Sequence, residues 1–162
     1  MDSPDLSDLS VLVVDDQVGM RRVIVNVFRD LGIRKIFEAG TGKDALQICA
    51  HDKPDIMFTD SAMSPMSGEQ LTRKIREGCD GIDPYLPIVM VSAYADLERI
   101  MGARDSGVTE FLAKPISAKK VYTRLMAVIS NPRIFVRSND FVGPDRRRHR
   151  RYFGGADRRA DK

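Results

Sequence analysis

The feature that most constrains the fold is a strand-like segment followed by a helical one, repeated five times in the first 130 residues. Each strand-like segment is a short, largely apolar run, and each helical segment carries apolar residues every three or four positions. Short apolar strands need cover on both faces, which is typical of a parallel sheet between helices. We therefore expect a doubly wound five-stranded α/β domain over residues 8–130. The expected strands are 11–14, 36–38, 55–59, 88–91 and 109–113, and the expected helices are 18–31, 41–50, 68–77, 96–104 and 117–130.

The composition fits a chain that folds around a core. Of its 162 residues, 43% are hydrophobic and 30% are charged, a balance typical of globular domains. The first ten residues are acidic and lack the basic and apolar regions of a signal peptide. No apolar run approaches the roughly 18 residues that span a bilayer. We therefore expect a cytoplasmic protein without a membrane span.

The composition changes after Pro132. Residues 133–162 carry a net charge of +6, from nine Arg and one Lys against four Asp, whereas residues 1–132 carry −3. This Arg-rich tail has too few apolar residues for a core of its own, so we expect it to be disordered when it is alone. It also holds a weak repeat, because FVGPDRR at 141–147 returns as FGGADRR at 153–159. The sequence thus predicts an acidic domain followed by a basic tail.

Polar residues stand at the carboxyl ends of the expected strands, where open α/β sheets bind their ligands. They are Asp15, Asp16, Asp60, Ser92 and Lys114. Three neighbouring carboxylates repel one another, and Mg²⁺ relieves that repulsion. The ammonium and the hydroxyl suit phosphoryl oxygens, which leaves one carboxylate free to attack phosphorus. A single strand-end Asp is more often a turn former or a helix cap, so the prediction rests on all five together.

Four motifs carry a resemblance to a known family: LVVDDQ at 12–17, MFTDSAMSPMSG at 57–68, VMVSAY at 89–94 and FLAKPIS at 111–117. Through them, residues 8–130 resemble the CheY-like receiver domains of two-component response regulators, which have a flavodoxin-like sheet. The resemblance implies a signalling switch rather than a turnover enzyme. It implies that Asp60 accepts phosphate from a histidine kinase.

The resemblance also implies the roles of the neighbouring residues. Asp16, Asp60 and the Ala62 carbonyl would hold Mg²⁺, with Asp15 orienting water in the metal shell. Ser92 and Lys114 would bind the phosphoryl group. Phe111 would be the aromatic switch residue, and the Lys114–Pro115 bond would be cis.

Two departures from the family pattern stand near the expected site. The family usually has Pro directly after the Met that Met63 matches, whereas Ser64 comes before Pro65 here. We therefore expect a differently shaped loop after the phosphoacceptor. Ala62 and Tyr94 stand at positions that tune dephosphorylation in the family, and the sequence does not predict the phosphate lifetime.

Three interpretations of the basic tail remain open. It could be a solvated tail without a ligand, a tether to nucleic acid or anionic membrane, or a site for a guanine nucleotide. An Arg fork matches guanine O6 and N7, and a carboxylate accepts from the N1 and N2 donors. Arg137 and Asp140 have the RxxD spacing with which inhibited diguanylate cyclases hold cyclic di-GMP, so we expect them on one base. The interleaved Asp residues favour the nucleotide site over a DNA tether.

The whole chain resembles the Cle group of CheY-like regulators. This resemblance implies cyclic di-GMP binding by the tail and an action on the flagellar motor switch protein, with no sequence-specific DNA contact and a monomeric chain. The alternative is a single-domain phosphorelay regulator whose tail only tethers it to nucleic acid or membrane. The expected ligand-binding residues are Arg137, Asp140, Asp145, Arg146, Arg147, Arg148, Arg151, Tyr152, Asp157, Arg158 and Arg159.

Overall fold

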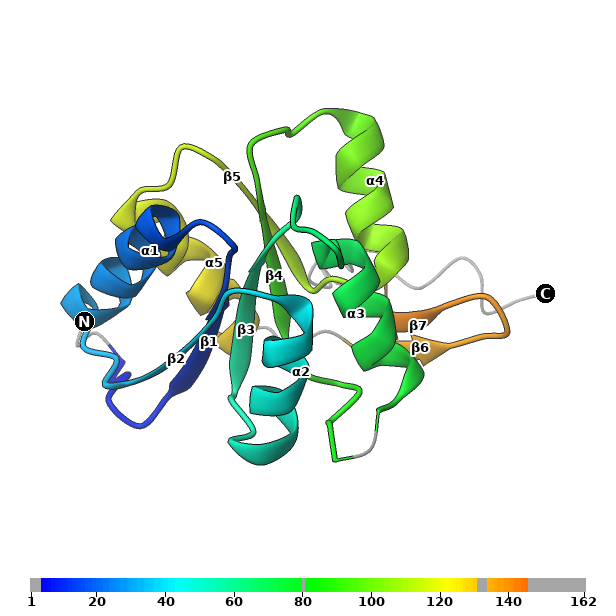
Figure 1. Cartoon of the computed structure of the whole chain (residues 1–162), viewed down its shortest axis with the longest axis horizontal. Helices are drawn as coiled ribbons and strands as arrows, with labels where there is room; N and C mark the ends of the chain where they lie inside the picture. Colours follow the sequence, from blue (N-terminus) through cyan, green and yellow to red (C-terminus); the bar gives the residue numbers. More distant parts are fainter. Residues whose placement is uncertain (1–3, 80, 131–133, 146–162) are drawn as a thin grey trace, which may run out of the picture.

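The computed structural model describes residues 4–79, 81–130 and 134–145. Five parallel strands form a sheet of order β2-β1-β3-β4-β5, with helices on both faces (Figure 1). The predicted doubly wound, flavodoxin-like fold is confirmed, and the expected bounds differ from the observed ones by one or two residues. The strands are β1 Ser10–Val14, β2 Lys35–Ala39, β3 Ile56–Asp60, β4 Ile88–Ser92 and β5 Glu110–Ala113, and the helices are α1 Val18–Asp30, α2 Gly42–His51, α3 Gly68–Glu77, α4 Leu97–Ser106 and α5 Ala118–Ser130.

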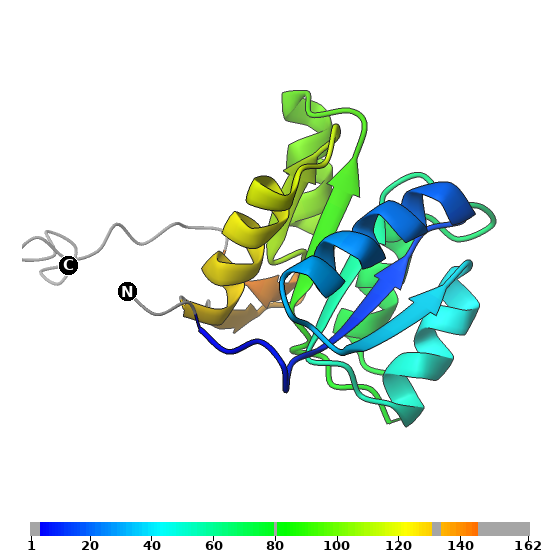
Figure 2. The same cartoon turned by 90° about the vertical axis from the view of Figure 1, so that its left-hand side faces the viewer.

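The core lies in two layers, one on each face of the sheet. Alternate residues of a strand point to opposite faces, so Val11 and Val13 of β1 pack with α1 and α5, which share one face (Figure 2). Leu12 and Val14 pack with α2, α3 and α4 on the other face. The three central strands β1, β3 and β4 are buried along their whole length. Their carboxyl ends are therefore held in fixed positions.

Local signals set the ends of the helices that follow these strands. Ser67 and Gln70 form a capping box at the start of α3, and Asp96 caps α4 by accepting a hydrogen bond from the Arg99 backbone N–H at 2.9 Å. Gly107 ends α4 with a φ of +104°, a left-handed conformation that favours glycine. These caps fix where the loops above the sheet begin.

The first part of the tail forms ordered structure on the receiver, which the expectation of disorder for the isolated tail did not cover. Residues 134–145 form the C-terminal hairpin, in which β6 Phe135–Arg137 pairs antiparallel with β7 Val142–Pro144. This hairpin lies beside the C-terminal ends of α3 and α4 (Figure 1, orange). It was not predicted because each strand is only three residues long and because the hairpin packs on receiver residues far away in the sequence. Residues 146–162 lie outside the described part of the chain.

Three contacts hold the hairpin against the domain. Gly143 lies so near the Gly107 Cα that a Cβ on it would be 2.9 Å away. The Phe135 ring stacks on the guanidinium of Arg76, with 4.9 Å between the guanidinium carbon and the ring centroid. Phe135 also meets the Tyr85 ring edge-on at 5.0 Å. The hairpin is therefore packed on the end of the sheet opposite the strand carboxyl ends.

None of the helices in the described ranges is long and apolar enough to cross a membrane.

Candidate functional site

Three carboxylates meet above the carboxyl ends of β1 and β3. Asp15 and Asp16 follow β1 directly, and Asp60 is the last residue of β3. One oxygen of each lies within 4.8 Å of the others. Asp15 and Asp60 are buried, whereas Asp16 is exposed. The structure thus brings together the three predicted acids at the predicted edge of the sheet.

The surroundings of Asp15 disfavour the charged form of its carboxyl. Burial raises the pKa of its carboxyl, and the negative charges of Asp60 and Asp16 act in the same direction, against the Gln17 backbone N–H and Lys114. Its Oδ1 accepts a hydrogen bond from that N–H at 2.9 Å. Its buried Oδ2 has no hydrogen-bond partner among the described residues.

A divalent cation fits this set of oxygens. Mg²⁺ takes oxygen ligands, keeps several waters and needs only one or two carboxylates. Such an ion would offset the repulsion among the three carboxylates, and it would give Asp15 Oδ2, which lacks a hydrogen-bond partner within the described ranges, a positive neighbour. The exposed Asp16 leaves the site open to solvent. The acidic cluster is therefore suited to Mg²⁺.

Lys114 supplies the positive charge of the site. Its Nζ lies 3.1 Å from Asp60 Oδ1 and 4.0 Å from Asp15 Oδ2. Its backbone N–H donates to the Ser92 carbonyl at 2.8 Å, which ties the end of β5 to β4. The Lys114–Pro115 peptide bond is cis, as expected.

Ser92 is buried at the end of β4, beside a residue that the sequence analysis missed. Ser61 Oγ donates a hydrogen bond to Ser92 Oγ at 2.9 Å, and the Tyr94 backbone N–H donates to the same oxygen at 3.2 Å. Ser61 directly follows Asp60, and that adjacency is the signal that could have found it. Two hydroxyls, rather than one, therefore stand next to the predicted phosphoacceptor.

Phe111 and Ala62 line one cleft beside this hydroxyl pair. The cleft has a volume of about 190 Å³ and is also lined by Ser92, Met90 and Arg99. Phe111 is half-buried and packs against the core layer of α2, α3 and α4. The half-buried Phe111 ring therefore borders open space on the side of the cleft.

The loop after Asp60 is pressed against α3. A Cβ on Gly68 would collide with the Asp60 carbonyl, and the Gly68 N–H donates to the Ser61 carbonyl at 3.0 Å. Only glycine fits this contact between a helix start and a strand end. The Ser64–Pro65 bond in the loop, where the sequence departs from the family pattern, is cis.

The tail residues are only partly brought together. Asp140, in the turn of the C-terminal hairpin, lines a pocket of about 570 Å³ with Arg73 and Arg76 of α3. Arg137 is exposed on β6 and is not among the described lining residues. Asp145 is the last described residue, and its N–H donates to the Ile134 carbonyl at 2.6 Å. The other expected ligand-binding residues, from Arg146 onward, lie outside the described ranges.

Comparison with known families decides the nature of the domain. Residues 11–126 match the response regulator receiver domain. The chain belongs to this family. The match ends at residue 126, so the C-terminal hairpin and the tail lie beyond it.

Curated relatives include chemotaxis proteins. The chain is 37% identical to the chemotaxis protein CheY of Pseudomonas aeruginosa over 111 residues, which cover 68% of this chain and 88% of that protein. It is 35% identical to CheY-3 of Vibrio cholerae over 118 residues, covering 73% and 89%. The receiver is thus CheY-like.

Solved structures share the fold. CheY4 of Vibrio cholerae superposes with a TM-score of 0.68 at 24% identity, covering 74% of this chain and 98% of that one. A CheX–CheY–BeF₃–Mg complex from Borrelia burgdorferi gives 0.66 at 27% identity, covering 75% and 89%. The receiver domain of a Pseudomonas aeruginosa sensor histidine kinase, with magnesium coordinated in its active-site cleft, gives 0.68 at 24% identity, covering 76% and 98%.

Proposed function

We propose that this chain is a cytoplasmic, monomeric response regulator that accepts a phosphoryl group on Asp60 from a histidine kinase. The observation that carries the proposal is the 3.1 Å contact between Lys114 Nζ and Asp60 Oδ1, next to the cluster of three carboxylates. An ammonium this close to a carboxylate offsets the negative charge that a phosphoryl group brings. The protein then acts as a signalling switch rather than as a turnover enzyme.

The transfer is a displacement at phosphorus. An Asp60 carboxylate oxygen forms a bond to the phosphorus of the kinase's phosphohistidine, and the bond between phosphorus and the imidazole nitrogen breaks. The leaving imidazole keeps the electron pair and takes up a proton. Lys114 and the Ser92 hydroxyl bind the phosphoryl oxygens. Asp16, Asp60 and the Ala62 carbonyl would hold Mg²⁺, with Asp15 orienting water in the metal shell, and the ion would supply positive charge to offset the negative charge of the phosphoryl group.

The hydroxyl pair and Phe111 convert the modification into a change of shape. In the unphosphorylated protein the Ser92 hydroxyl accepts a hydrogen bond from Ser61 Oγ at 2.9 Å. A phosphoryl oxygen on Asp60 would compete for a hydrogen bond with the same Ser92 hydroxyl. When Ser92 moves toward the phosphoryl group, Phe111 turns into the adjacent cleft. The face built from α4, β5 and α5 then changes, because Phe111 belongs to β5.

A phosphate-affinity gel with a small-molecule phosphodonor tests the acceptor. We expect the wild type to shift in the presence of Mg²⁺ and Asp60→Asn not to shift. Asp44→Asn removes an exposed carboxylate in the first turn of α2 that is not a member of the acidic cluster, and serves as the matched control. Equal shifts in the wild type and in Asp60→Asn would refute the assignment.

We further propose that the basic tail binds cyclic di-GMP and that the bound form acts on the flagellar motor switch protein. The proposal is supported by the nine Arg and four Asp of residues 133–162, by the resemblance to the Cle group and by the position of Asp140 on a pocket wall. The carboxylates distinguish a guanine-reading site from a polyanion tether, because they would weaken a tether.

Asp140→Ala separates the nucleotide site from the tether. The substitution raises the net charge by one, so a tether binds DNA and nucleotides more tightly. A guanine-reading site instead loses most of its affinity for cyclic di-GMP. Calorimetry at two salt concentrations measures both, and tighter binding by the variant would contradict the nucleotide site.

The protein partner is tested by capture from a flagellated cell's lysate with and without cyclic di-GMP. We expect recovery of the motor switch protein that depends on the nucleotide. Recovery of nucleic acid alone would favour the phosphorelay regulator with a tethering tail.

A further inference from the structure

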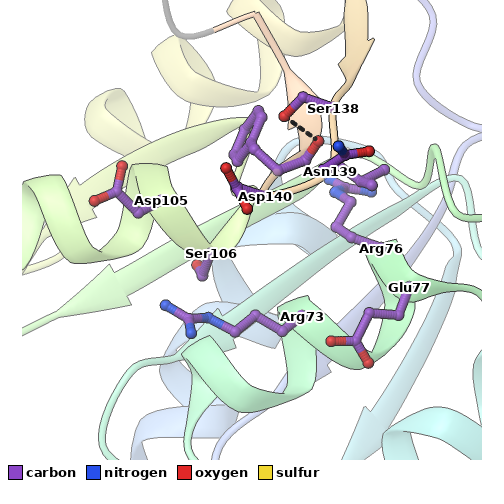
Figure 3. Close-up of a pocket in the computed structure, with 10 residues that line it drawn as sticks. Arg73, Arg76, Glu77, Asp105, Ser106, Ser138, Asn139 and Asp140 are labelled. Carbon is purple, nitrogen blue, oxygen red and sulfur yellow. Dashed lines mark hydrogen bonds between the residues drawn. The ribbon is translucent and has the colours of Figure 1, made fainter.

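A second pocket lies at the end of α3 opposite Asp60. It opens between the C-terminal ends of α3 and α4 and the turn of the C-terminal hairpin (Figure 3). Its volume of about 570 Å³ falls within the range of roughly 300–1,000 Å³ that is usual for small-molecule sites. The charged and polar side chains that line it are Arg73, Arg76, Glu77, Asp105, Ser106, Ser138, Asn139 and Asp140.

Hydrogen bonds of the buried Arg76 side chain hold one wall of this pocket in place. Arg76 is only 2% exposed. Its Nε donates to the Gly107 carbonyl at 2.9 Å, and its Nη1 donates to the Pro84 and Leu86 carbonyls at 2.7 Å each. It therefore ties α3 to the loop that leads into β4 and to the residue that ends α4. Its buried Nη2 has no hydrogen-bond partner in the described part of the chain, which leaves an unused donor in the wall.

The hairpin turn that carries Asp140 is also fixed. The Ser138 N–H donates to the Phe141 carbonyl at 2.7 Å, which closes the turn. Gly143 packs against Gly107, which anchors the second strand. Asp140 is thus presented at the pocket by a closed turn and not by a free chain end.

Arg73 and Asp140 offer complementary groups to the pocket. Figure 3 shows Arg73 reaching from α3 below Ser106, with Asp140 above it on the hairpin turn. Both side chains are exposed, and no ion pair of either is found among the described residues. A five-donor fork and a two-oxygen acceptor therefore face the same space from the receiver and from the tail.

The charges of the lining select the kind of ligand. The two positive charges of the lining Arg residues face three negative charges, on Glu77, Asp105 and Asp140. A bare phosphate or polyphosphate therefore gains no net attraction here. A planar group that presents two acceptors on one edge and two N–H donors on the next fits better. Guanine has this pattern, with O6 and N7 for an Arg fork and N1 and N2 for a carboxylate, whereas adenine lacks the paired donors.

We propose that this pocket binds a guanine base of the tail's nucleotide ligand, read by Arg73 of α3 and Asp140 of the C-terminal hairpin. The inference rests on the proposed binding of cyclic di-GMP and names part of that site. It assigns the arginine partner of Asp140 to the receiver domain rather than to Arg137. The ligand then bridges receiver and tail, and it reaches the end of α3 remote from Asp60.

Calorimetry of the full chain with cyclic di-GMP tests the site through Arg73. We expect Arg73→Lys and Arg73→Gln to bind at least tenfold more weakly than the wild type, because an ammonium cannot form the planar fork. Lys74→Gln removes a charge one residue away on the same helix, outside the described lining, and is expected to stay within about twofold. Because Arg73 is exposed, the melting temperatures of these variants should match that of the wild type.

The remaining outcomes overturn the inference in distinguishable ways. Wild-type affinity in Arg73→Lys would show that Arg73 supplies only charge, and the proposed function would stand without this site. Equal affinity of the wild type for cyclic di-AMP would refute guanine reading. No binding of cyclic di-GMP by the wild type would remove the proposed nucleotide function and this inference together.

Discussion

Gly143→Ala tests how the C-terminal hairpin is held on the receiver. A Cβ at this position would lie 2.9 Å from the Gly107 Cα and 2.9 Å from the Phe141 Cζ. The ring can turn aside, but the Gly107 Cα is backbone and cannot. Gly143 is not among the glycines with positive φ, so any effect comes from contact and not from backbone conformation.

The size of the effect follows from two opposing sets of contacts. Forcing an extra methyl into a packed contact costs about 1–3 kcal/mol. The ring contacts that hold the hairpin are the edge-on pair of Phe135 with Tyr85, worth about 0.5–1.5 kcal/mol, and Arg76 over Phe135, worth about 0.5–2 kcal/mol. The two sets are of similar size. We therefore expect the hairpin to leave its place while the sheet stays intact.

Hydrogen–deuterium exchange measures this release directly. A two-stranded hairpin is marginally stable by itself, so the amides of Ser138 and Asp145, which are hydrogen-bonded within the hairpin at 2.7 and 2.6 Å, should exchange at least tenfold faster in Gly143→Ala. Protection in β3 and β4 should not change.

Gly19→Ala is the matched control. Gly19 is in α1 with nothing within 4 Å of its added Cβ, and the change should stabilise the helix by about 0.5–1 kcal/mol without affecting the hairpin. If the hairpin amides of Gly143→Ala exchange as slowly as those of the wild type, the Gly143–Gly107 contact does not hold the hairpin on the receiver, and the reasoning is refuted.

Three further outcomes are expected. Arg76→Met removes the donor of three carbonyls, of which that of Pro84 is partly buried and the other two are buried, and should lower the free energy of unfolding by about 2–4 kcal/mol; a loss below about 1 kcal/mol in urea titrations would contradict the anchoring role. Asp15→Asn keeps the acceptor for the Gln17 N–H and should raise the metal-free melting temperature at pH 7, because burial and the Asp60 charge raise the pKa of the Asp15 carboxyl and so disfavour its charged form; the difference should disappear at acidic pH, where that carboxyl is protonated. Millimolar Mg²⁺ should raise the melting temperature of the wild type, chelation should reverse the gain, and Asp15→Asn should show a smaller one.

The receiver could be predicted from the sequence because its signals are local and repeated. Each strand is a run of apolar residues ended by a polar one, and the helices carry their own caps, such as Thr41, whose side chain accepts from the Asp44 N–H at 3.1 Å. In a parallel sheet all such strand ends share one edge. The meeting of Asp15, Asp16 and Asp60 follows from that rule without knowledge of any contact.

The hairpin and the pocket beneath it could not be predicted in this way. Phe135 and Gly143 gain their partners from residues 76, 85 and 107, which are far along the chain, and three-residue strands carry too little periodicity to be recognised. Arg76 resembles an ordinary surface residue of a helix, yet it is 2% exposed. Its burial depends on three carbonyls that only the folded chain assembles.

Helix α3 touches both sites of the molecule. At one end, Gly68 lies against the Asp60 carbonyl, and at the other, Arg76 carries the hairpin. These two residues are eight positions apart on α3, which at a rise of 1.5 Å per residue is about 12 Å along the helix axis. If a change at Asp60 shifts α3 and so alters the binding free energy of a ligand at the other end of the helix, linkage requires the reciprocal effect. Binding of that ligand then changes the free energy of the event at Asp60 by the same amount. If both proposed inputs move α3, a shift of this helix would be the shared coordinate along which they add or oppose each other.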